Sequence, residues 1–278
     1  MKTLLTACIL TFSFSLSGLS YNNLDSLLVE LERTMSKRAV FDTAKKLRIE
    51  NLEKLLKESD STSLQNNYFL VSEIIKEYEK YSFDKALIFI EKGLNIANTL
   101  NDDNLKKESQ LKLAKLLVTS GRYKEAIDVL HEIERHLLPK KLLDLYYYNY
   151  KEAYSGLSFY TTVSNSKQSY SKLYKVYQDS LQQQLAPNSN ESLALIEKEF
   201  RDNREIEKAL EINSKRLSKV ALGTPNYSLI TFERSLLYGL NSNTNEQKKF
   251  LILSAISDIK ASVKDNASLT ELAMILFD

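Results

Sequence analysis

The stretch that decides the fold is LAKLLVTSGRYKEAIDVLHEIERHLLP, residues 113–139. Its first part spaces Leu113, Ala114 and Leu117 along one face of a helix. Gly121 follows, and glycine adopts the positive φ that ends a helix at the least steric cost. A second apolar face then consists of Tyr123, Ala126, Ile127, Leu130 and Ile133, with Pro139 just beyond it. The stretch therefore predicts two amphipathic helices joined by a tight turn.

Small residues at set positions indicate how such helices pack. Ala126 lies on the inner face of the second predicted helix, where a small side chain lets a neighbouring helix approach closely. The order of residue types resembles the tetratricopeptide repeat: a small residue at Ala114, a turn residue at Gly121, an aromatic residue at Tyr123 and a second small residue at Ala126. Ala86 occupies the position of this second small residue one repeat earlier. The resemblance implies an all-α, right-handed α-solenoid in which each helix pair shields the apolar face of the next.

Composition supports this fold class. Six glycines and three prolines in 278 residues favour a nearly all-helical chain, and the formal charge of +2 offers no basic footprint for nucleic acid. Asn188 and Asn243 are expected to cap helix starts. About five helix pairs are expected. Besides the pair in 113–139, they are 66–81 with 83–100, 141–160 with 165–185, 191–203 with 205–222, and 227–240 with 245–264.

Residues 1–20 have the pattern of a secretory signal peptide. Lys2 precedes an apolar run from Leu4 to Leu16, and no further charge occurs before Asp25. A buried first helix is the alternative, and the residues up to Cys8 also resemble a lipoprotein signal, so lipidation at Cys8 is a second alternative. Cys8 is the only cysteine, so the mature chain would carry no disulfide. We expect an exported protein of the periplasm or cell envelope.

The remaining chain divides into two parts. Residues 21–62 predict two helices without the repeat pattern, and we interpret them as an N-terminal helical cap. Residues 63–278 predict the tetratricopeptide-like solenoid. A final helix near Ser268 has an apolar face with no partner after it, so the solenoid is expected to be truncated in its last repeat.

Both ends of the chain resemble one family of bacterial cell-envelope tetratricopeptide regulators of the domain-of-unknown-function type. The similar segments are LLVELE (27–32), IENL (49–52) and the ending from Ser254 to Asp278. The resemblance implies that the repeats are followed by a membrane helix and a cytoplasmic DNA-binding segment, parts that are missing here. Membrane anchoring would then occur only through a missing downstream part, and this segment would bind no nucleic acid.

The sequence shows no pattern of catalytic or metal-binding residues. His131 and His136 are the only histidines, and five positions rotate a helix by roughly 140°, so they cannot face one metal. No phosphate-binding loop or nucleophile elbow is present. Carboxylates such as Glu197 and Glu199 are expected on solvated helix faces. We therefore predict no enzyme activity, no metal and no cofactor.

Tyrosine is concentrated in one region. Nine of the sixteen tyrosines lie between residues 146 and 177. Tyr147, Tyr150 and Tyr154 share a helical face with leucines, which favours a role in the core. In tetratricopeptide folds, however, the first helix of each pair lines the concave groove, and tyrosine suits binding surfaces. The predicted partner-binding groove residues are Tyr146, Tyr148, Tyr150 and Tyr154.

Together these features predict an extracytoplasmic protein–protein interaction module. A protein or peptide segment would lie in its concave groove, and the chain would be the sensing or docking part of a longer membrane-anchored signalling or transcription-regulating protein. One alternative is a free-standing periplasmic scaffold for envelope assembly. The other is a glycan-binding or glycan-cleaving helical protein, which would have aromatic platforms beside paired acids in one cleft.

Overall fold

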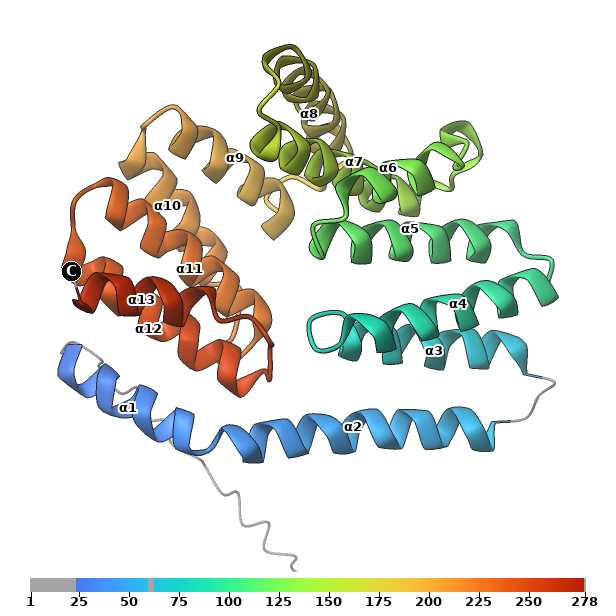
Figure 1. The fold of residues 1–278 in the computed structure, drawn as a ribbon, viewed down its shortest axis with the longest axis horizontal. Coiled ribbons are helices and arrows are strands. Elements are labelled where there is room, and N and C mark those ends of the chain that lie inside the picture. Colours follow the sequence, from blue (N-terminus) through green and yellow to red (C-terminus); the bar gives the residue numbers. More distant parts are fainter. Residues whose placement is uncertain (1–23, 60–62, 278) are drawn as a thin grey trace, which may run out of the picture.

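The computed structural model describes residues 24–59 and 63–277, and within them every regular element is a helix (Figure 1). The predicted signal peptide at residues 1–20 lies outside the described residues. In the described part, successive antiparallel helix pairs stack along an arc. The predicted all-α solenoid of tetratricopeptide-like helix pairs is thus confirmed. The right-handed sense of the solenoid stays a prediction.

The helix pairs follow one another as the sequence predicts. The pairs are α3 (Leu64–Tyr78) with α4 (Phe83–Thr99), α5 (Asp103–Thr119) with α6 (Tyr123–His131), α7 (Lys140–Tyr160) with α8 (Ser164–Gln184), α9 (Asn190–Asp202) with α10 (Ile206–Leu217), and α11 (Pro225–Leu240) with α12 (Thr244–Lys260). The other helices are α1 (Leu24–Ser36), α2 (Arg38–Glu58), the 3-10 turn η1 (Arg135–Leu137) and α13 (Ala267–Phe277).

The residues of the repeat pattern lie at helix contacts. Ala86, Ala114 and Ala126 are fully buried. Gly121 has φ +80° in the turn between α5 and α6, a conformation that residues with a Cβ rarely adopt. Tyr123 begins α6, and its ring lies directly against Gly156 of α7. These placements explain how α6 can pack closely on both α5 and α7.

Helix starts follow local capping chemistry. Asn243 Oδ1 accepts a hydrogen bond from the backbone N of Glu246 at 3.2 Å, so its predicted capping role is confirmed. The predicted cap at Asn188 is wrong, because Ser189 Oγ caps α9 by accepting from the backbone N of Ser192 at 3.1 Å. Asn188 instead adopts φ +63° in the turn before the helix, a conformation that asparagine tolerates better than most residues.

Helices α1 and α2 bridge the two ends of the arc. In Figure 1 they run along the bottom, from below α12 and α13 to below α3. Helix α1 packs on α12, while α2 packs on α3 and also reaches α12. The interpretation of residues 21–62 as a cap stays a prediction. The contact of α1 with the far end of the arc is a finding that the sequence does not indicate.

Polar contacts hold the place where the two ends meet. The backbone N of Lys264, just after α12, donates to the carbonyl O of Lys80 at 3.1 Å. The Lys264 side chain lies 2.9 Å from Asp42 Oδ2 of α2. Burial alone would raise the pKa of Asp42, but the hydrogen bond and charge of Lys264 hold it below its usual value. The ammonium groups of Lys45 and Lys264 lie 5.3 and 5.2 Å from the centre of the Tyr81 ring.

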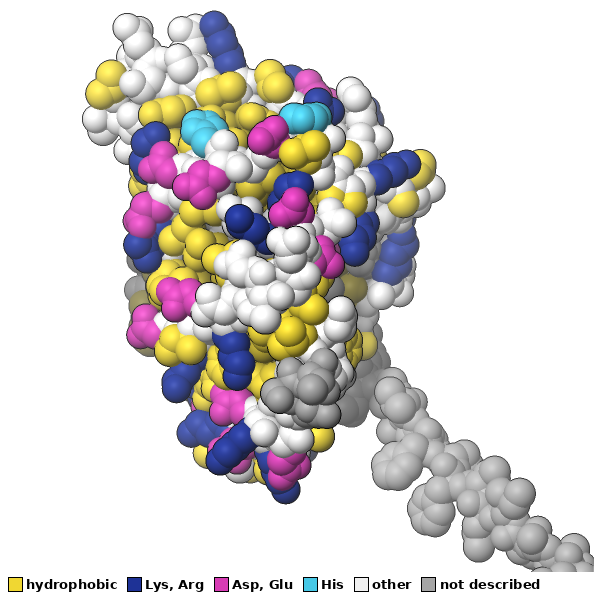
Figure 2. All heavy atoms as spheres, turned by 90° about the vertical axis from the view of Figure 1, so that its right-hand side faces the viewer, with side chains coloured by type: hydrophobic (Ala, Val, Ile, Leu, Met, Phe, Trp, Pro, Cys, Tyr) yellow, Lys and Arg dark blue, Asp and Glu magenta, His cyan; other side chains and the backbone are white. Residues whose placement is uncertain are grey.

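Charges are mixed on the surface that Figure 2 shows. Basic and acidic side chains alternate there with small apolar areas, and no continuous basic patch covers this face. The arrangement agrees with the near-balanced composition. It is typical of solvated helix faces rather than of a nucleic-acid-binding surface.

The contact between Tyr123 and Gly156 yields a stability prediction. A Cβ on residue 156 would lie 2.3 to 2.5 Å from three atoms of the Tyr123 ring, whereas a Cβ on Gly93, also within a helix, meets only ordinary contacts from 3.4 Å. Gly156→Ala should therefore lower the free energy of unfolding by about 1–3 kcal/mol, because the ring must be displaced from the helix. Gly93→Ala should be neutral or stabilising. Urea denaturation of both variants measures the difference, and equal midpoints would contradict the packing described.

Candidate functional site

A cavity of about 470 Å³ opens between the α7–α8 pair and helices α9, α10 and α11. It forms where α8 packs only sparsely on α9, so the stacking of successive pairs is interrupted. Most of its wall comes from α7, α9 and α11, the first helices of three successive pairs. Its size falls within the range of small-molecule binding sites in proteins. This cavity is the candidate functional site.

The structure separates the four tyrosines predicted to line a groove. Tyr148 lies on the cavity wall and is half-buried. Tyr146, Tyr150 and Tyr154 are buried in the core instead, and α8 covers Tyr150 and Tyr154. The ring of Tyr150, for example, stacks on that of Tyr177 of α8 with centroids 4.3 Å apart. Partner binding by these residues stays a prediction, and Tyr148 alone of the four is placed at the cavity.

Tyr148 is surrounded by charged side chains. The ammonium group of Lys151, itself buried, lies 5.3 Å from the centre of the Tyr148 ring and 2.5 Å from Glu152 Oε1. Burial raises the pKa of Tyr148, and the carboxylates of Glu152, Glu79 and Glu233 add to the shift. The phenol is therefore neutral at physiological pH and can donate a hydrogen bond.

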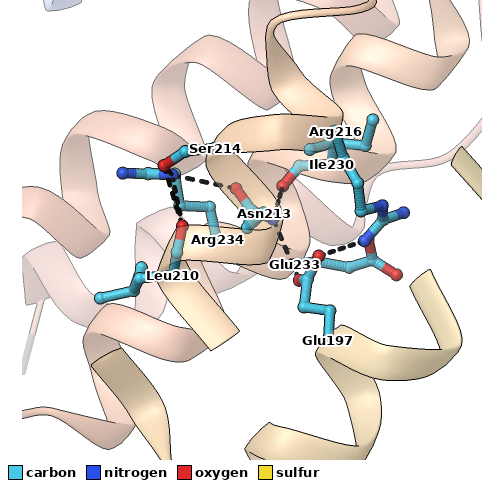
Figure 3. Close-up of polar contacts among 8 residues, drawn as sticks. All are labelled: Glu197, Leu210, Asn213, Ser214, Arg216, Ile230, Glu233 and Arg234. Carbon is cyan, nitrogen blue, oxygen red and sulfur yellow. Dashed lines mark hydrogen bonds and ion pairs between the residues drawn. The ribbon is translucent and has the colours of Figure 1, made fainter. Parts of the chain in front are cut away.

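Deeper in the cavity, one guanidinium is shared by two carboxylates. Arg216 Nη1 of α10 contacts Glu197 Oε2 of α9, and it lies 2.7 Å from Glu233 Oε2 of α11 (Figure 3). The side chains of Arg216 and Glu197 are each only 4% exposed, and that of Glu233 is 25% exposed. The group carries one more negative than positive charge, because two acids share a single cation.

This crowding affects both buried members of the group. Burial raises the pKa of Glu197, which Arg216 counteracts and the like charge of Glu233 reinforces. Burial would lower the pKa of Arg216, but Glu233 and Glu197 together raise it. Arg216 is therefore a permanent cation, and Glu197 binds a proton more readily than an exposed glutamate does.

Asn213 connects this ion group to the packing of three helices. Its Nδ2 donates to Glu197 Oε1 at 3.0 Å and to the carbonyl O of Ile230 at 3.1 Å, while its Oδ1 accepts from Arg234 Nη1 at 3.2 Å (Figure 3). Asn213 is fully buried, so these bonds satisfy a side chain that water cannot reach. The network fixes α9, α10 and α11 relative to one another and orients Glu197 towards Arg216.

Three buried polar atoms of cavity-lining residues have no hydrogen-bond partner in the described part of the chain. They are Arg216 Nε, Tyr174 Oη and Asn190 Oδ1. Folded proteins leave few buried polar groups unpaired, and such groups point to a missing water, ion or ligand. Such atoms also occur elsewhere in the described residues, at Asp42, Asn149, Arg234 and Ser262, so the feature is shared by the cavity and is not confined to it.

The histidines lie away from this cavity. The ring of His131 is 6.0 Å from that of Tyr150, and His136 Nε2 is 3.6 Å from Glu134. Over residues 24–59 and 63–277, no group of three or more His, Cys, Asp or Glu side chains is arranged to hold a metal ion. Over the same ranges, no helix combines the length and hydrophobicity needed to cross a membrane.

Sequence analysis missed the shared ion group. Glu197 was expected on a solvated face together with Glu199, but Glu197 is buried and only Glu199 is exposed. A signal was present: Glu197 falls four residues after the buried Leu193, and Arg216 continues the buried face of Ala209 and Asn213. A charged residue on an apolar face has to find a buried partner, and here the partners lie on neighbouring helices.

The stacked helix pairs, with small residues at their contacts, define a tetratricopeptide-repeat domain. The chain matches the family described as SusR N-terminal TPR domain over residues 35–278 and belongs to that family. A comparison with curated proteins finds no match. Because tetratricopeptide domains in general are non-enzymatic scaffolds that bind protein partners, the family indicates a protein–protein interaction or sensing module.

The raised pKa of Glu197 leads to a pH prediction. Its folded state holds a proton more tightly than the unfolded chain, so the stabilisation from protonation is complete below the ordinary glutamate pKa of about 4.3 and is lost as the pH rises through the folded pKa. Glu197→Gln keeps the shape of the side chain but removes the group that gains and loses a proton, and it leaves Arg216 paired with Glu233. The variant should therefore gain stability relative to the wild type as the pH rises.

Urea denaturation from about pH 4.5 to 8 measures this difference. Glu199→Gln is the control, because it removes an exposed glutamate from the same helix. The control curve should run parallel to that of the wild type. A Glu197→Gln curve that is also parallel to the wild type would contradict the buried state of this carboxyl group.

Proposed function

We propose that this protein is an extracytoplasmic docking or sensing module that recognises a protein segment through its concave face. In this proposal it forms the first part of a longer, membrane-anchored signalling or transcription-regulating protein. The observation that carries the proposal is the position of Tyr148 on a cavity lined by the first helices of three pairs. A preorganised stack of helices presents such a surface with little ordering cost on binding.

Two features support the wider context. The family is named for an N-terminal domain, which suits a module followed by other parts. The first twenty residues combine Lys2 with an uncharged apolar run, the pattern of an export signal. A module outside the cytoplasm that is linked to an output inside would need a membrane anchor downstream of the repeats.

Export can be tested with a reporter. Alkaline phosphatase fused after Asp278 should be active in cells, because the enzyme folds only when its disulfides can form outside the cytoplasm. Deleting residues 1–20 should abolish that activity while leaving the amount of fusion protein similar by immunoblot. Equal phosphatase activity of the two fusions would overturn the proposed location.

Docking can be tested at Tyr148. Affinity capture of envelope proteins with the wild-type chain identifies a partner, whose binding is then titrated against variants. Tyr148→Ala should weaken binding roughly tenfold or more, as truncation of a central aromatic side chain does. Tyr160→Ala removes an exposed tyrosine at the end of the same helix and should change little.

The affinity of Tyr148→Ala for the partner, compared with that of Tyr160→Ala, decides whether Tyr148 lies in the partner-binding surface. Unchanged binding by Tyr148→Ala would remove the groove proposal. A partner that stays bound under all growth conditions would favour the alternative of a free-standing scaffold for envelope assembly.

One observation favours a second candidate, a glycan-binding helical protein. Tyr148 and Tyr174 lie on the same cavity as Glu197 and Glu233, so aromatic platforms and paired acids occur together. Cleavage of a glycan is not supported, because Arg216 Nη1 lies between the two carboxylates that would have to flank the scissile bond. Binding of a neutral oligosaccharide in calorimetry, lost in Tyr148→Ala, would establish this candidate.

A further inference from the structure

The cavity has an excess of positive charge around Tyr174. Three cations and two carboxylates act on this tyrosine. The cations are Lys151, Lys198 and Arg201, and the carboxylates are Glu152 and Asp202. Lys198 lies 5.4 Å from the centre of the Tyr174 ring and 2.6 Å from Asp202, which also pairs with Arg201 at 3.5 Å. Among these five side chains one positive charge therefore lacks a matching carboxylate, while Glu191 is a further carboxylate on the cavity wall.

The other end of the same cavity has the opposite excess. Glu197 and Glu233 share the single charge of Arg216, which leaves one negative charge unmatched. Tyr148 lies within electrostatic reach of carboxylates from both ends, Glu152 at the positive end and Glu233 at the negative end. Both charge groups thus face a single space of about 470 Å³.

The unpaired polar atoms add hydrogen-bonding capacity at both ends. Tyr174 Oη at the positive end can donate to a carboxylate, and Asn190 Oδ1 can accept from an ammonium group, whereas Arg216 Nε is a donor and could serve only an acceptor atom of a ligand. The Arg216 side chain is only 4% exposed, so bulk water cannot supply a hydrogen-bond partner for its Nε. Neighbouring side chains cover these atoms, so a ligand reaches them only if those side chains change rotamer, as is common on ligand binding.

We infer that this cavity binds a small zwitterion, a free α-amino acid or a short peptide, with its carboxylate at Lys198, Arg201 and Tyr174 and its ammonium group at Glu233 and Glu197. Each end of such a ligand supplies the charge that the corresponding end of the cavity lacks. The cavity volume suits a molecule of this size.

Other ligand classes fit the charges less well. A polyanion such as a phosphate ester would place like charges against Glu197 and Glu233, and a simple cation would leave the single unmatched positive charge near Tyr174 uncompensated. A neutral molecule can form hydrogen bonds in the cavity but leaves both charge excesses uncompensated. The zwitterion is the class that satisfies both ends at once.

This assignment goes beyond the proposed function and does not depend on it. A protein segment on the concave face is tested by partner capture with Tyr148 variants, whereas the zwitterion is tested by direct binding with variants of Tyr174 and Lys198. Either proposal can fail while the other stands.

The experiment is isothermal titration calorimetry of the full chain with the standard free amino acids and a set of dipeptides. At least one zwitterion should bind and raise the melting temperature. Its N-acetyl and C-terminal amide derivatives, which each lack one charge, should bind roughly tenfold more weakly, the effect of one hydrogen bond to a charged group. Absence of binding by the whole set, or equal binding of the singly charged derivatives, overturns the inference.

Two variants localise the binding. Tyr174→Phe removes a hydroxyl that has no hydrogen-bond partner in the described residues, so it should keep the melting temperature and weaken the zwitterion roughly tenfold. Lys198→Met removes the unmatched positive charge and should weaken binding of the zwitterion to a similar extent. The matched controls are Tyr170→Phe, earlier on α8 and outside the cavity, and Lys215→Met, in a surface ion pair on α10.

The controls should bind the zwitterion like the wild type. Equal binding by Tyr174→Phe and Tyr170→Phe would show that the ligand lies elsewhere and would overturn the site. Binding of a neutral oligosaccharide when no zwitterion of the set binds would also overturn the inference and would support the glycan candidate instead.

Discussion

Burial of α12 on nearly every side is the constraint on which the closed shape of the molecule depends. Helices α11, α13, α1 and α2 all pack on it, and every residue from Phe250 to Ser257 is buried. A helix with apolar and small residues all round is stable only when covered on all faces. Its serines are satisfied by buried carbonyl groups: Ser254 Oγ donates to the carbonyl O of Ser228 of α11 at 2.8 Å, and Ser257 Oγ to that of Leu253 of α12 itself at 2.9 Å. The surrounding helices therefore have to meet around α12, which closes the arc.

The helix pairs were predictable from sequence because each depends on local spacing. Apolar residues three or four apart, Gly121 at a turn and Asn243 at a helix start act within a few residues of themselves. Closure of the arc was not predictable, since it rests on contacts such as Lys260 with Glu30 at 3.4 Å and Lys264 with Asp42 at 2.9 Å. Both pairs join residues more than two hundred positions apart, and surface-type charges carry no information about distant partners.

The candidate site was predictable only in part, for a related reason. Helical geometry shows that three consecutive tyrosines cannot share one face, and Tyr148 is indeed the one at the cavity while Tyr146 and Tyr147 are buried. Which face of α7 is covered by α8 depends on tertiary packing. The spacing of residues alone therefore could not show that Tyr150 and Tyr154 lie in the core and not at the cavity. The ion group of Glu197, Arg216 and Glu233 spans three helices. Spacing indicates the buried faces on which Glu197 and Arg216 lie, but it does not indicate which residues of other helices pair with them.

The position of both terminal helices on α12 has a mechanical consequence. Helices α1 and α13 rest on the same support, and the two ends of the described chain lie on one side of the arc (Figure 1). A rotation of α12 therefore carries both ends along as one body, and the separation between them changes little. Motion within the arc would be delivered to whatever is attached there as a twist rather than as a stretch.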